Sequence, residues 1–177
     1  EGTLDKYIGD AIMAFWNAPS PDPDHAGKAV ATLLAMPATM EQINRSFREK
    51  GLPPISCGAG VNTGQCSVGL MGSRRRLGYT GIGDAVNLAS RLEGLTRAYG
   101  VENCIGEQTA EITKDRFAIL EIELVAVKGR TRPERVHTVI GDAEMARTAD
   151  FARTADLLAE ARAAYHARDW DKAEARF

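Results

Sequence analysis

The chain has 177 residues, of which 44% are hydrophobic and 26% are charged, and its formal net charge is −2. This length accommodates one ordinary domain with a buried core plus an appendage, and it does not call for two large domains. The near-neutral charge excludes a broad basic surface, so we expect no nucleic-acid partner. No apolar run approaches the roughly 20 residues that a membrane-spanning helix requires.

Cysteine usage argues against disulfide bonds and a zinc site. The cysteines are odd in number and lack metal-ligand spacing, which favours buried thiols in a reducing compartment; they are Cys57, Cys66 and Cys104. The chain begins without methionine or a signal peptide and ends inside an amphipathic helical pattern. We therefore interpret it as an excerpt of a longer protein.

A tight β-hairpin is the first predicted element. Two short β-prone runs, Thr3 to Ile8 and Ala11 to Trp16, flank the dipeptide Gly9-Asp10, which is typical of a turn with a polar tip. A proline-rich stretch then leads into a long predicted helix from roughly His25 to Lys50, which a Gly-Leu-Pro-Pro sequence ends.

Glycine-rich strands and a second helix follow. Ile55 to Val61 and Gln65 to Met71 are strand-like, and their glycines allow backbone or ligand to approach closely. The dense basic run at 74–76 is interpreted as a solvated hairpin tip. From Asp84 to Tyr99 the apolar positions mostly follow a 3.6-residue period, with Gly100 closing the predicted helix and Asp84 as its expected N-cap.

The remaining elements complete an α+β pattern. A short strand, a short helix and two further strands are predicted at Asn103 to Gly106, Glu107 to Thr113, Phe117 to Val127 and Val136 to Ile140. Helices interleaved with hairpin-connected strands indicate a mostly antiparallel sheet packed with helices. No Walker or Rossmann glycine motif is present, which argues against a doubly wound nucleotide fold.

The pattern changes after Gly141 to an alanine-rich helix at Phe151 to Ala167. We therefore divide the chain into residues 1–141 and a C-terminal unit, 142–177, made of a linker and helical segment. The spacing of four side chains in this unit is similar to the first helix and turn of a tetratricopeptide-type repeat: Tyr165, Trp170, Ala173 and Phe177. Such a segment is a candidate site for a protein partner.

Four side chains can carry chemistry by their position. Asp10 at the hairpin tip is a natural ligand for Mg²⁺, which takes one or two carboxylates together with phosphate oxygens and water, although Gly-Asp is also ordinary turn chemistry. Lys6 lies four residues earlier, roughly 13 Å away along an extended strand, so the two cannot easily serve one small substrate. Asn87 and Arg91 are four residues apart and share one face of the predicted helix.

Two segments resemble a known family: Lys6 to Phe15, with the sequence KYIGDAIMAF, and Tyr79 to Arg91, with YTGIGDAVNLASR. Together they resemble the active-site motifs of the class III nucleotidyl cyclases, which make a cyclic nucleotide from a nucleoside triphosphate. The resemblance runs from about Gly2 to Ile140 and implies the ferredoxin-like fold of that family. It also implies a head-to-tail homodimer, in which Asp10 of one chain works with Lys6 of the other.

The resemblance implies that the site recognises adenine. Thr80 occupies the position of the second purine-reading residue, and a lysine and threonine pair is found in a bacterial subgroup of adenylyl cyclases. The ammonium of Lys6 can donate to a ring nitrogen of adenine, while the Thr80 hydroxyl accepts from the amino group. Guanine presents a protonated ring nitrogen instead, which leaves the lysine facing a donor.

The resemblance also implies roles for the remaining site residues. Asn87 orients the ribose, Arg91 stabilises charge developing at the α-phosphorus, and Lys128 in the sequence VKGR holds the terminal phosphates. Asp10 is the metal ligand, and two Mg²⁺ or Mn²⁺ ions are expected in each site. The second metal aspartate of the family belongs to a strand expected before Glu1, so we expect the fragment alone to be inactive.

The sequence thus predicts an adenylate cyclase domain that converts ATP to 3′,5′-cyclic AMP and pyrophosphate. Three alternatives remain open: a non-catalytic regulatory or dimerisation domain, a guanylate cyclase, and a helical partner module with the α+β part as scaffold. At family level we expect a cytoplasmic domain of a bacterial parent that is anchored in the inner membrane.

Overall fold

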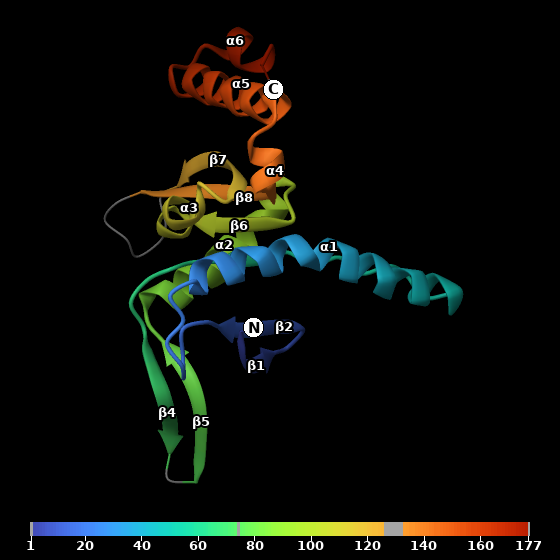
Figure 1. Ribbon diagram of the computed structural model, residues 1–177. Helices are drawn as coiled ribbons and strands as arrows, with labels where there is room; N and C mark the ends of the chain where they lie inside the picture. Colours follow the sequence, from blue (N-terminus) through green and yellow to red (C-terminus); the bar gives the residue numbers. More distant parts are fainter. Residues whose placement is uncertain (1, 74, 126–132, 177) are drawn as a thin grey trace.

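The computed structural model describes residues 2–73, 75–125 and 133–176 (Figure 1). None of the helices within these ranges is long and apolar enough to cross a membrane. The elements in chain order are β1 (Thr3–Ile8), β2 (Ala11–Phe15), α1 (His25–Glu49), β3 (Ala59–Val61), β4 (Ser67–Ser73), β5 (Arg76–Ile82), α2 (Asp84–Tyr99), β6 (Asn103–Gly106), α3 (Glu107–Thr113), β7 (Phe117–Val125), β8 (Glu134–Asp142), α4 (Ala143–Ala146), α5 (Ala149–His166) and α6 (Trp170–Glu174).

The described strands form one four-stranded sheet and two hairpins. The sheet has the order β3-β6-β8-β7, and only its β3–β6 pair is parallel. The hairpins β1–β2 and β4–β5 are antiparallel, and in Figure 1 both lie below α1 and α2, whereas β6, β7 and β8 lie above these helices. The predicted α+β class with a mostly antiparallel sheet is therefore confirmed.

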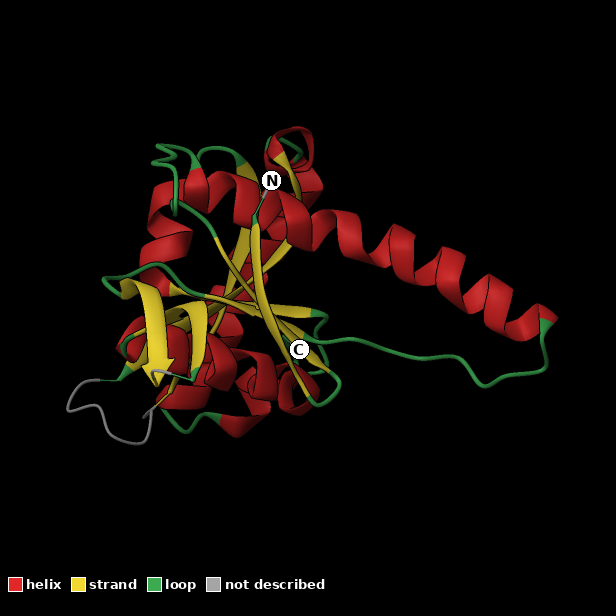
Figure 2. Ribbon diagram, turned by 90° about the horizontal axis from the view of Figure 1, so that it is seen from below, coloured by secondary structure: helices red, strands yellow, loops and turns green. Residues whose placement is uncertain are grey.

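Two apolar clusters pack α1 and α2 onto the four-stranded sheet. Val30 of α1 belongs to the cluster that contains Ile105, and Leu88 of α2 belongs to the cluster that contains Cys104. Since successive side chains of a strand point to opposite faces, the neighbours Cys104 and Ile105 of β6 place the two helices on opposite sides of the sheet. Only the first turns of α1 are buried, and the rest of the helix projects away from the sheet (Figure 2).

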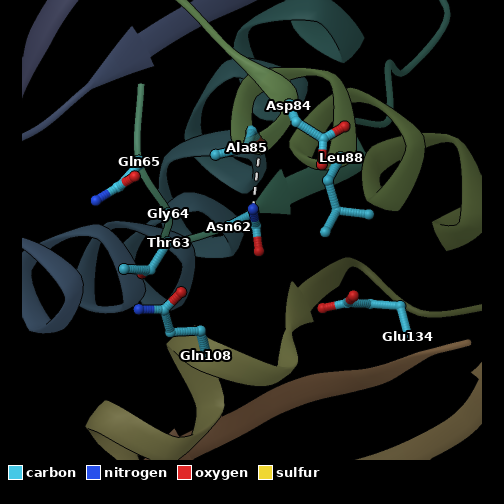
Figure 3. A pocket seen from close by; sticks show the side chains of 9 residues that line it. All are labelled: Asn62, Thr63, Gly64, Gln65, Asp84, Ala85, Leu88, Gln108 and Glu134. Carbon is cyan, nitrogen blue, oxygen red and sulfur yellow. Dashed lines mark hydrogen bonds between the residues drawn. The ribbon is translucent and has the colours of Figure 1, made fainter. Parts of the chain in front are cut away.

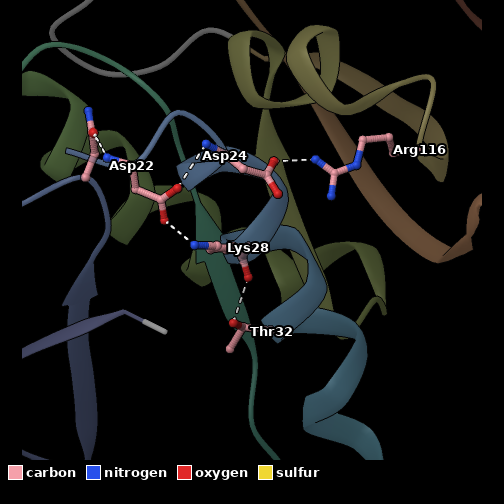
Figure 4. A network of polar contacts seen from close by, with 6 residues as sticks. Asp22, Asp24, Lys28, Thr32 and Arg116 are labelled. Carbon is pink, nitrogen blue, oxygen red and sulfur yellow. Dashed lines mark hydrogen bonds and ion pairs between the residues drawn. The ribbon is translucent and has the colours of Figure 1, made fainter. Parts of the chain in front are cut away.

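A polar network fixes the start of α1 (Figure 4). The Lys28 ammonium lies 2.7 Å from the Asp22 carboxylate. The Arg116 guanidinium, which is distant in the sequence, forms an ion pair with the Asp24 carboxylate. Because Arg116 immediately precedes β7, this second pair ties the helix start to the edge of the sheet. The hydrogen bond from its cationic partner lowers the pKa of each aspartate and outweighs burial, which raises it, so both pKa values lie below their ordinary range.

Gly60 in β3 determines how closely α2 approaches the sheet. A Cβ atom at this position would lie 2.2 Å from the Ala89 carbonyl oxygen and 2.3 Å from the Glu93 backbone nitrogen. Only glycine therefore permits the observed packing, because the atoms in the way are helix backbone. Any side chain here would displace the helix that carries Asn87 and Arg91.

We expect Gly60→Ala to lower the free energy of unfolding by about 2 kcal/mol or more, since the helix backbone must move to admit the methyl group. Urea denaturation monitored by circular dichroism measures this. Gly94→Ala is the matched control, because Gly94 is exposed on α2 and a Cβ there would meet nothing within 4 Å. In a helix interior that change stabilises by about 0.5–1 kcal/mol. Equal effects of the two substitutions would contradict the packing described.

Three local predictions are corrected by the structure. The strand expected from Ile55 begins only at Ala59, because the backbone N–H and C=O of Ile55 both pair with the side-chain amide of Asn44 at 2.8 Å. The N-cap of α2 is Gly83, and Asp84 is the first helical residue. Of the three cysteines, which are all free, only one is buried, so the expectation of three buried thiols is wrong.

The tip of the β4–β5 hairpin agrees with the sequence interpretation. Arg75 is exposed in the turn between the two strands. Arg74 lies outside the described residues. The strand that follows leads through Gly83 directly into α2, so Thr80 on β5 and the pair Asn87 and Arg91 on α2 lie on consecutive elements.

The C-terminal helix α5 is held on β7 by a partly buried ion pair. The Arg162 guanidinium contacts the Glu121 carboxylate, and their side chains are 17% and 25% exposed. Arg135 approaches the same carboxylate at 3.3 Å. Burial raises the pKa of Glu121, but the hydrogen bond and charge of Arg162, together with the charges of Arg135 and His137, bring that pKa below its usual value of 4.5.

A lowered pKa means that the ionised Glu121 stabilises the fold. This stabilisation is present above about pH 4.5 and is lost as the pH falls through the lower folded-state pKa. We expect Arg162→Met to cost about 1–3 kcal/mol at pH 7 and to reduce the loss of stability on acidification. Arg153→Met, at an exposed position of the same helix, is the control. Denaturation at pH 7 and at pH 4 measures the free energy of unfolding of both variants. Equal losses of stability in the two variants would refute the role of the ion pair.

Candidate active site

The β1–β2 hairpin carries the candidate metal ligand and one purine-reading candidate. Its register pairs Ile8 with Ala11, so Gly9 and Asp10 form a two-residue turn, and Gly9 has a φ of 65°. Asp10 is exposed at this tip, and its carboxylate makes no hydrogen bond or ion pair with the described part of the chain. Lys6 lies within β1 with 46% of its side chain exposed.

A β-bulge in β1 brings a residue into the site that sequence reasoning missed. Leu4 pairs with Ala14 and Lys6 with Met13, which leaves Asp5 as an extra residue without a partner of its own. A bulge bends the strand and re-aims side chains that would otherwise alternate between faces. Asp5 and its neighbour Lys6 therefore contact each other instead of pointing to opposite sides.

The Asp5 carboxylate joins the two purine-reading candidates. Its Oδ1 atom lies 3.5 Å from the Lys6 ammonium, and the side chain of Asp5 is only 3% exposed. Its Oδ2 atom accepts a hydrogen bond of 2.5 Å from the Thr80 hydroxyl and one of 3.4 Å from the Gly81 backbone N–H. Lys6 and Thr80, which are 74 positions apart in the sequence, thus share one carboxylate.

Packing supports this junction between the first hairpin and β5. Thr80 pairs with Gly69 of β4 and is 8% exposed. The ring of Phe15, at the end of β2, lies 5.9 Å from the ring of Tyr79. The aromatic contact lies beside the hydrogen bond, so both polar and apolar contacts hold β1–β2 against β5.

Helix α2 presents Asn87 and Arg91 to solvent. The opposite face of the helix is buried through Ala85, Leu88 and Leu92, which orients the helix on the sheet. Asn87 and Arg91 are one turn apart on the exposed face, as predicted. Their side chains make no hydrogen bond or ion pair with any residue in the described ranges, so both are available to a ligand.

A polar cavity of about 340 Å³ lies at the start of α2 (Figure 3). The Asn62 side-chain amide donates a hydrogen bond of 3.2 Å to the Ala85 carbonyl at its edge. None of the predicted site residues that the structure describes lines this cavity, so it is not the place where they meet. Its lining residues are Asn62, Thr63, Gly64, Gln65, Asp84, Ala85, Leu88, Gln108 and Glu134.

Of the two residues predicted to bind the terminal phosphates and the metal ion, the structure describes only Asp10. Lys128 lies outside the described residues. Within the described ranges, no group of three or more His, Cys, Asp or Glu side chains is arranged to hold a metal ion. Asp10 nevertheless fits a magnesium site that is completed by substrate, because Mg²⁺ is commonly bound by one or two carboxylates together with phosphate oxygens and water.

The sequence matches known cyclases over most of its length. Residues 5–141 match the family model of the adenylate and guanylate cyclase catalytic domain. The chain is 36% identical over 141 residues to adenylate cyclase 1 of Rhizobium meliloti, which covers 80% of this chain and 21% of that protein. It is 37% identical over 145 residues to an adenylate cyclase of Anabaena cylindrica, covering 78% of this chain and 28% of the relative. The chain thus spans less than a third of either relative.

Solved structures agree with the fold. The adenylyl cyclase CyaB from P. aeruginosa superposes with a TM-score of 0.73 at 36% identity, over 78% of this chain and 71% of that chain. The guanylyl cyclase Cya2 superposes with a TM-score of 0.73 at 33% identity, over 81% and 72%. Equal scores for an adenylyl and a guanylyl cyclase mean that the backbone does not decide the purine. The ferredoxin-like cyclase fold is confirmed, and the chain belongs to the adenylate and guanylate cyclase catalytic domain family.

Proposed function

We propose that this domain is an adenylate cyclase that converts ATP to 3′,5′-cyclic AMP and pyrophosphate. The contact of Lys6 and Thr80 with one buried carboxylate carries the proposal, because it brings a cationic donor and a hydroxyl together. Adenine offers a ring nitrogen acceptor beside an amino donor, which matches this pair. Guanine offers a ring N–H and a carbonyl oxygen at the same edge, so its ring N–H would face the lysine.

The exposed face of α2 supplies the groups for the ribose and phosphates. Asn87 hydrogen-bonds and orients the ribose, and Arg91 neutralises charge that develops at the α-phosphate. The ribose 3′-hydroxyl loses its proton to water, the O3′–Pα bond forms as the bond from Pα to the oxygen that bridges to the β-phosphate breaks, and pyrophosphate leaves with that bridging oxygen. Lys128 holds the terminal phosphates in this proposal.

Asp10 would hold a Mg²⁺ or Mn²⁺ ion, with the triphosphate of the substrate supplying further oxygen ligands. When bound, the two ions proposed for each site lower the pKa of the ribose 3′-hydroxyl and neutralise the triphosphate. The second ion needs a further carboxylate ligand, which we assign to a part of the protein outside the described residues. The role of Asp10 is to fix the site at the exposed end of a rigid two-residue turn, where a large anionic substrate can reach it.

The active form is proposed to be a head-to-tail homodimer. Large apolar side chains are exposed on both hairpins, with Tyr7 69% and Ile12 65% exposed on the first and Leu70 70% exposed on the second. Apolar exposure of this extent on neighbouring elements is typical of an interaction surface. A second copy that covers these hairpins places its Asp10 opposite the Lys6 and Thr80 of the first copy.

The C-terminal unit is proposed to be a linker and helical segment that binds a protein partner. The rings of Tyr165 and Trp170 meet edge to face at 5.5 Å and are 49% and 57% exposed. Exposed aromatic side chains of this kind are enriched at protein interfaces. The boundary at residues 141 and 142 and the similarity to a tetratricopeptide repeat remain predictions.

The proposed activity is tested with the full-length protein. ATP or GTP is supplied with Mg²⁺ or Mn²⁺, and the products are identified by mass spectrometry, with Asp10→Asn as the comparison. We expect cyclic AMP and pyrophosphate from ATP, and a loss of at least 100-fold in the variant. A protein that binds ATP without forming cyclic AMP would instead be the regulatory domain that the sequence left as an alternative.

A further inference from the structure

We propose that Asp5 is a positioning residue that sets the purine preference by fixing the direction of the Thr80 hydroxyl. This inference rests on the proposed function, because it concerns how the same site distinguishes adenine from guanine. A threonine hydroxyl is by itself ambiguous, since it both donates and accepts hydrogen bonds. It can therefore accept from the amino group of adenine or donate to the carbonyl oxygen of guanine.

The contact with Asp5 removes this ambiguity. An ionised carboxylate only accepts hydrogen bonds, so the Thr80 hydroxyl gives its single proton to Asp5 across 2.5 Å. Two lone pairs remain on the Thr80 oxygen, and both are acceptors. The hydroxyl then matches a purine amino group and opposes a purine carbonyl.

Burial makes the arrangement persistent. The Asp5 side chain is 3% exposed and Thr80 is 8% exposed, so water competes weakly for either group. The Gly81 backbone N–H donates to the same Oδ2 atom as the hydroxyl, which fixes the orientation of the carboxylate. The bulge that leaves Asp5 unpaired in β1 is what allows its side chain to reach β5.

The same carboxylate also orients Lys6. The Lys6 ammonium lies 3.5 Å from Oδ1 and has three protons, so contact with Asp5 leaves donors for a ring nitrogen. The buried Asp5 carboxylate thereby holds a donor, the Lys6 ammonium, beside an acceptor, the Thr80 hydroxyl oxygen. This is the pattern complementary to the Watson–Crick edge of adenine.

The test uses full-length protein and measures two ratios in each preparation. The first is the kcat/KM for ATP divided by that for GTP. The second is the ratio of affinities for 3′-deoxy-ATP and 3′-deoxy-GTP, which lack the attacking hydroxyl and report binding alone. Because each ratio is taken within one preparation, a loss of folded protein cancels.

We expect Asp5→Ala to lower both ratios about tenfold, mainly through better use of the guanine nucleotide, since the freed hydroxyl can now donate to its carbonyl oxygen. Asp5→Asn keeps an oxygen opposite Thr80 and Gly81 and is expected to retain the ratios within about threefold. Glu111→Ala, which removes an exposed carboxylate that pairs with Lys114, is expected to change neither ratio.

A double-mutant cycle assigns the effect to the hydroxyl. In a Thr80→Val background, Asp5→Ala is expected to leave the ratios unchanged, and this double variant also avoids an unpaired buried hydroxyl. Equal weakening of adenine and guanine nucleotides by Asp5→Ala, or an unchanged ratio, would overturn the inference. So would a wild-type protein without preference between the two 3′-deoxy analogues.

The two proposals can fail separately. A wild-type protein that prefers 3′-deoxy-ATP but makes no cyclic AMP removes the proposed activity, while the affinity ratios of the Asp5 variants still decide the role of Asp5. A wild-type protein that makes cyclic AMP with ratios insensitive to Asp5→Ala retains the activity and removes the positioning role.

Discussion

Replacing Arg91 with alanine is expected to lower kcat about 100- to 1000-fold, with a much smaller change in KM for ATP. Arg91 is exposed on α2, and its guanidinium has no partner in the described part of the chain, so it contributes little to folding. Its charge becomes useful when negative charge builds up at the α-phosphate, which occurs in the transition state and not in bound ATP. Steady-state kinetics with ATP measure both constants.

Arg97→Ala is the matched control for Arg91. Both arginines are exposed on α2, but Arg97 lies in the last turn of the helix, nearly two turns further from Asn87. We expect the control to keep kcat within about twofold of the wild-type value, as surface substitutions usually do. An Arg91→Ala variant that retains wild-type kcat, or a control that loses as much, would contradict the assignment.

Mixing two inactive variants is expected to restore activity if the site forms between subunits. Asp10→Ala lacks the metal ligand, and Lys6→Ala lacks the purine donor. A mixed dimer of the two keeps one complete site, composed of Lys6 from the first variant and Asp10 from the second. Random assembly of equal amounts makes half of the dimers mixed, so about a quarter of the wild-type activity should return.

The restored activity should depend on subunit exchange. Each variant assayed alone provides the baseline, and a mixture of Asp10→Ala with Asp10→Ala/Lys6→Ala is the control that contains no intact Asp10. No recovery in a mixture shown to exchange subunits, for example by a tag pull-down, would place Asp10 and Lys6 in the same site. The head-to-tail proposal would then be wrong.

Local sequence signals predicted much of the fold well. The bounds of α2, β6 and α3 agree with the helix from Asp84, the strand from Asn103 and the helix from Glu107. In each case the signals are contiguous, because apolar periodicity is followed by a glycine or a break. The hairpin around Gly9 and Asp10 was found for the same reason.

The features that sequence reasoning missed depend on residues far apart in the chain. The strand expected from Ile55 is replaced by a loop because Asn44, 11 residues earlier, satisfies its backbone groups. Asp5 was overlooked because strict strand alternation places it on the face opposite to Lys6, and only the bulge reverses this. Its partner Thr80 is 75 residues away. An acidic residue directly before Lys6 was the one available signal.

A competition between ATP and GTP tests the adenine-reading site most directly. Equimolar nucleotides are given to the full-length protein and to its Lys6→Glu/Thr80→Cys variant, and cyclic AMP and cyclic GMP are quantified together. We predict that cyclic AMP exceeds cyclic GMP at least about tenfold in the wild type, equivalent to about 1.4 kcal/mol, and that the variant shifts the ratio towards cyclic GMP. A wild-type protein that makes mainly cyclic GMP, or a variant with an unchanged ratio, would contradict the reading of adenine by Lys6 and Thr80.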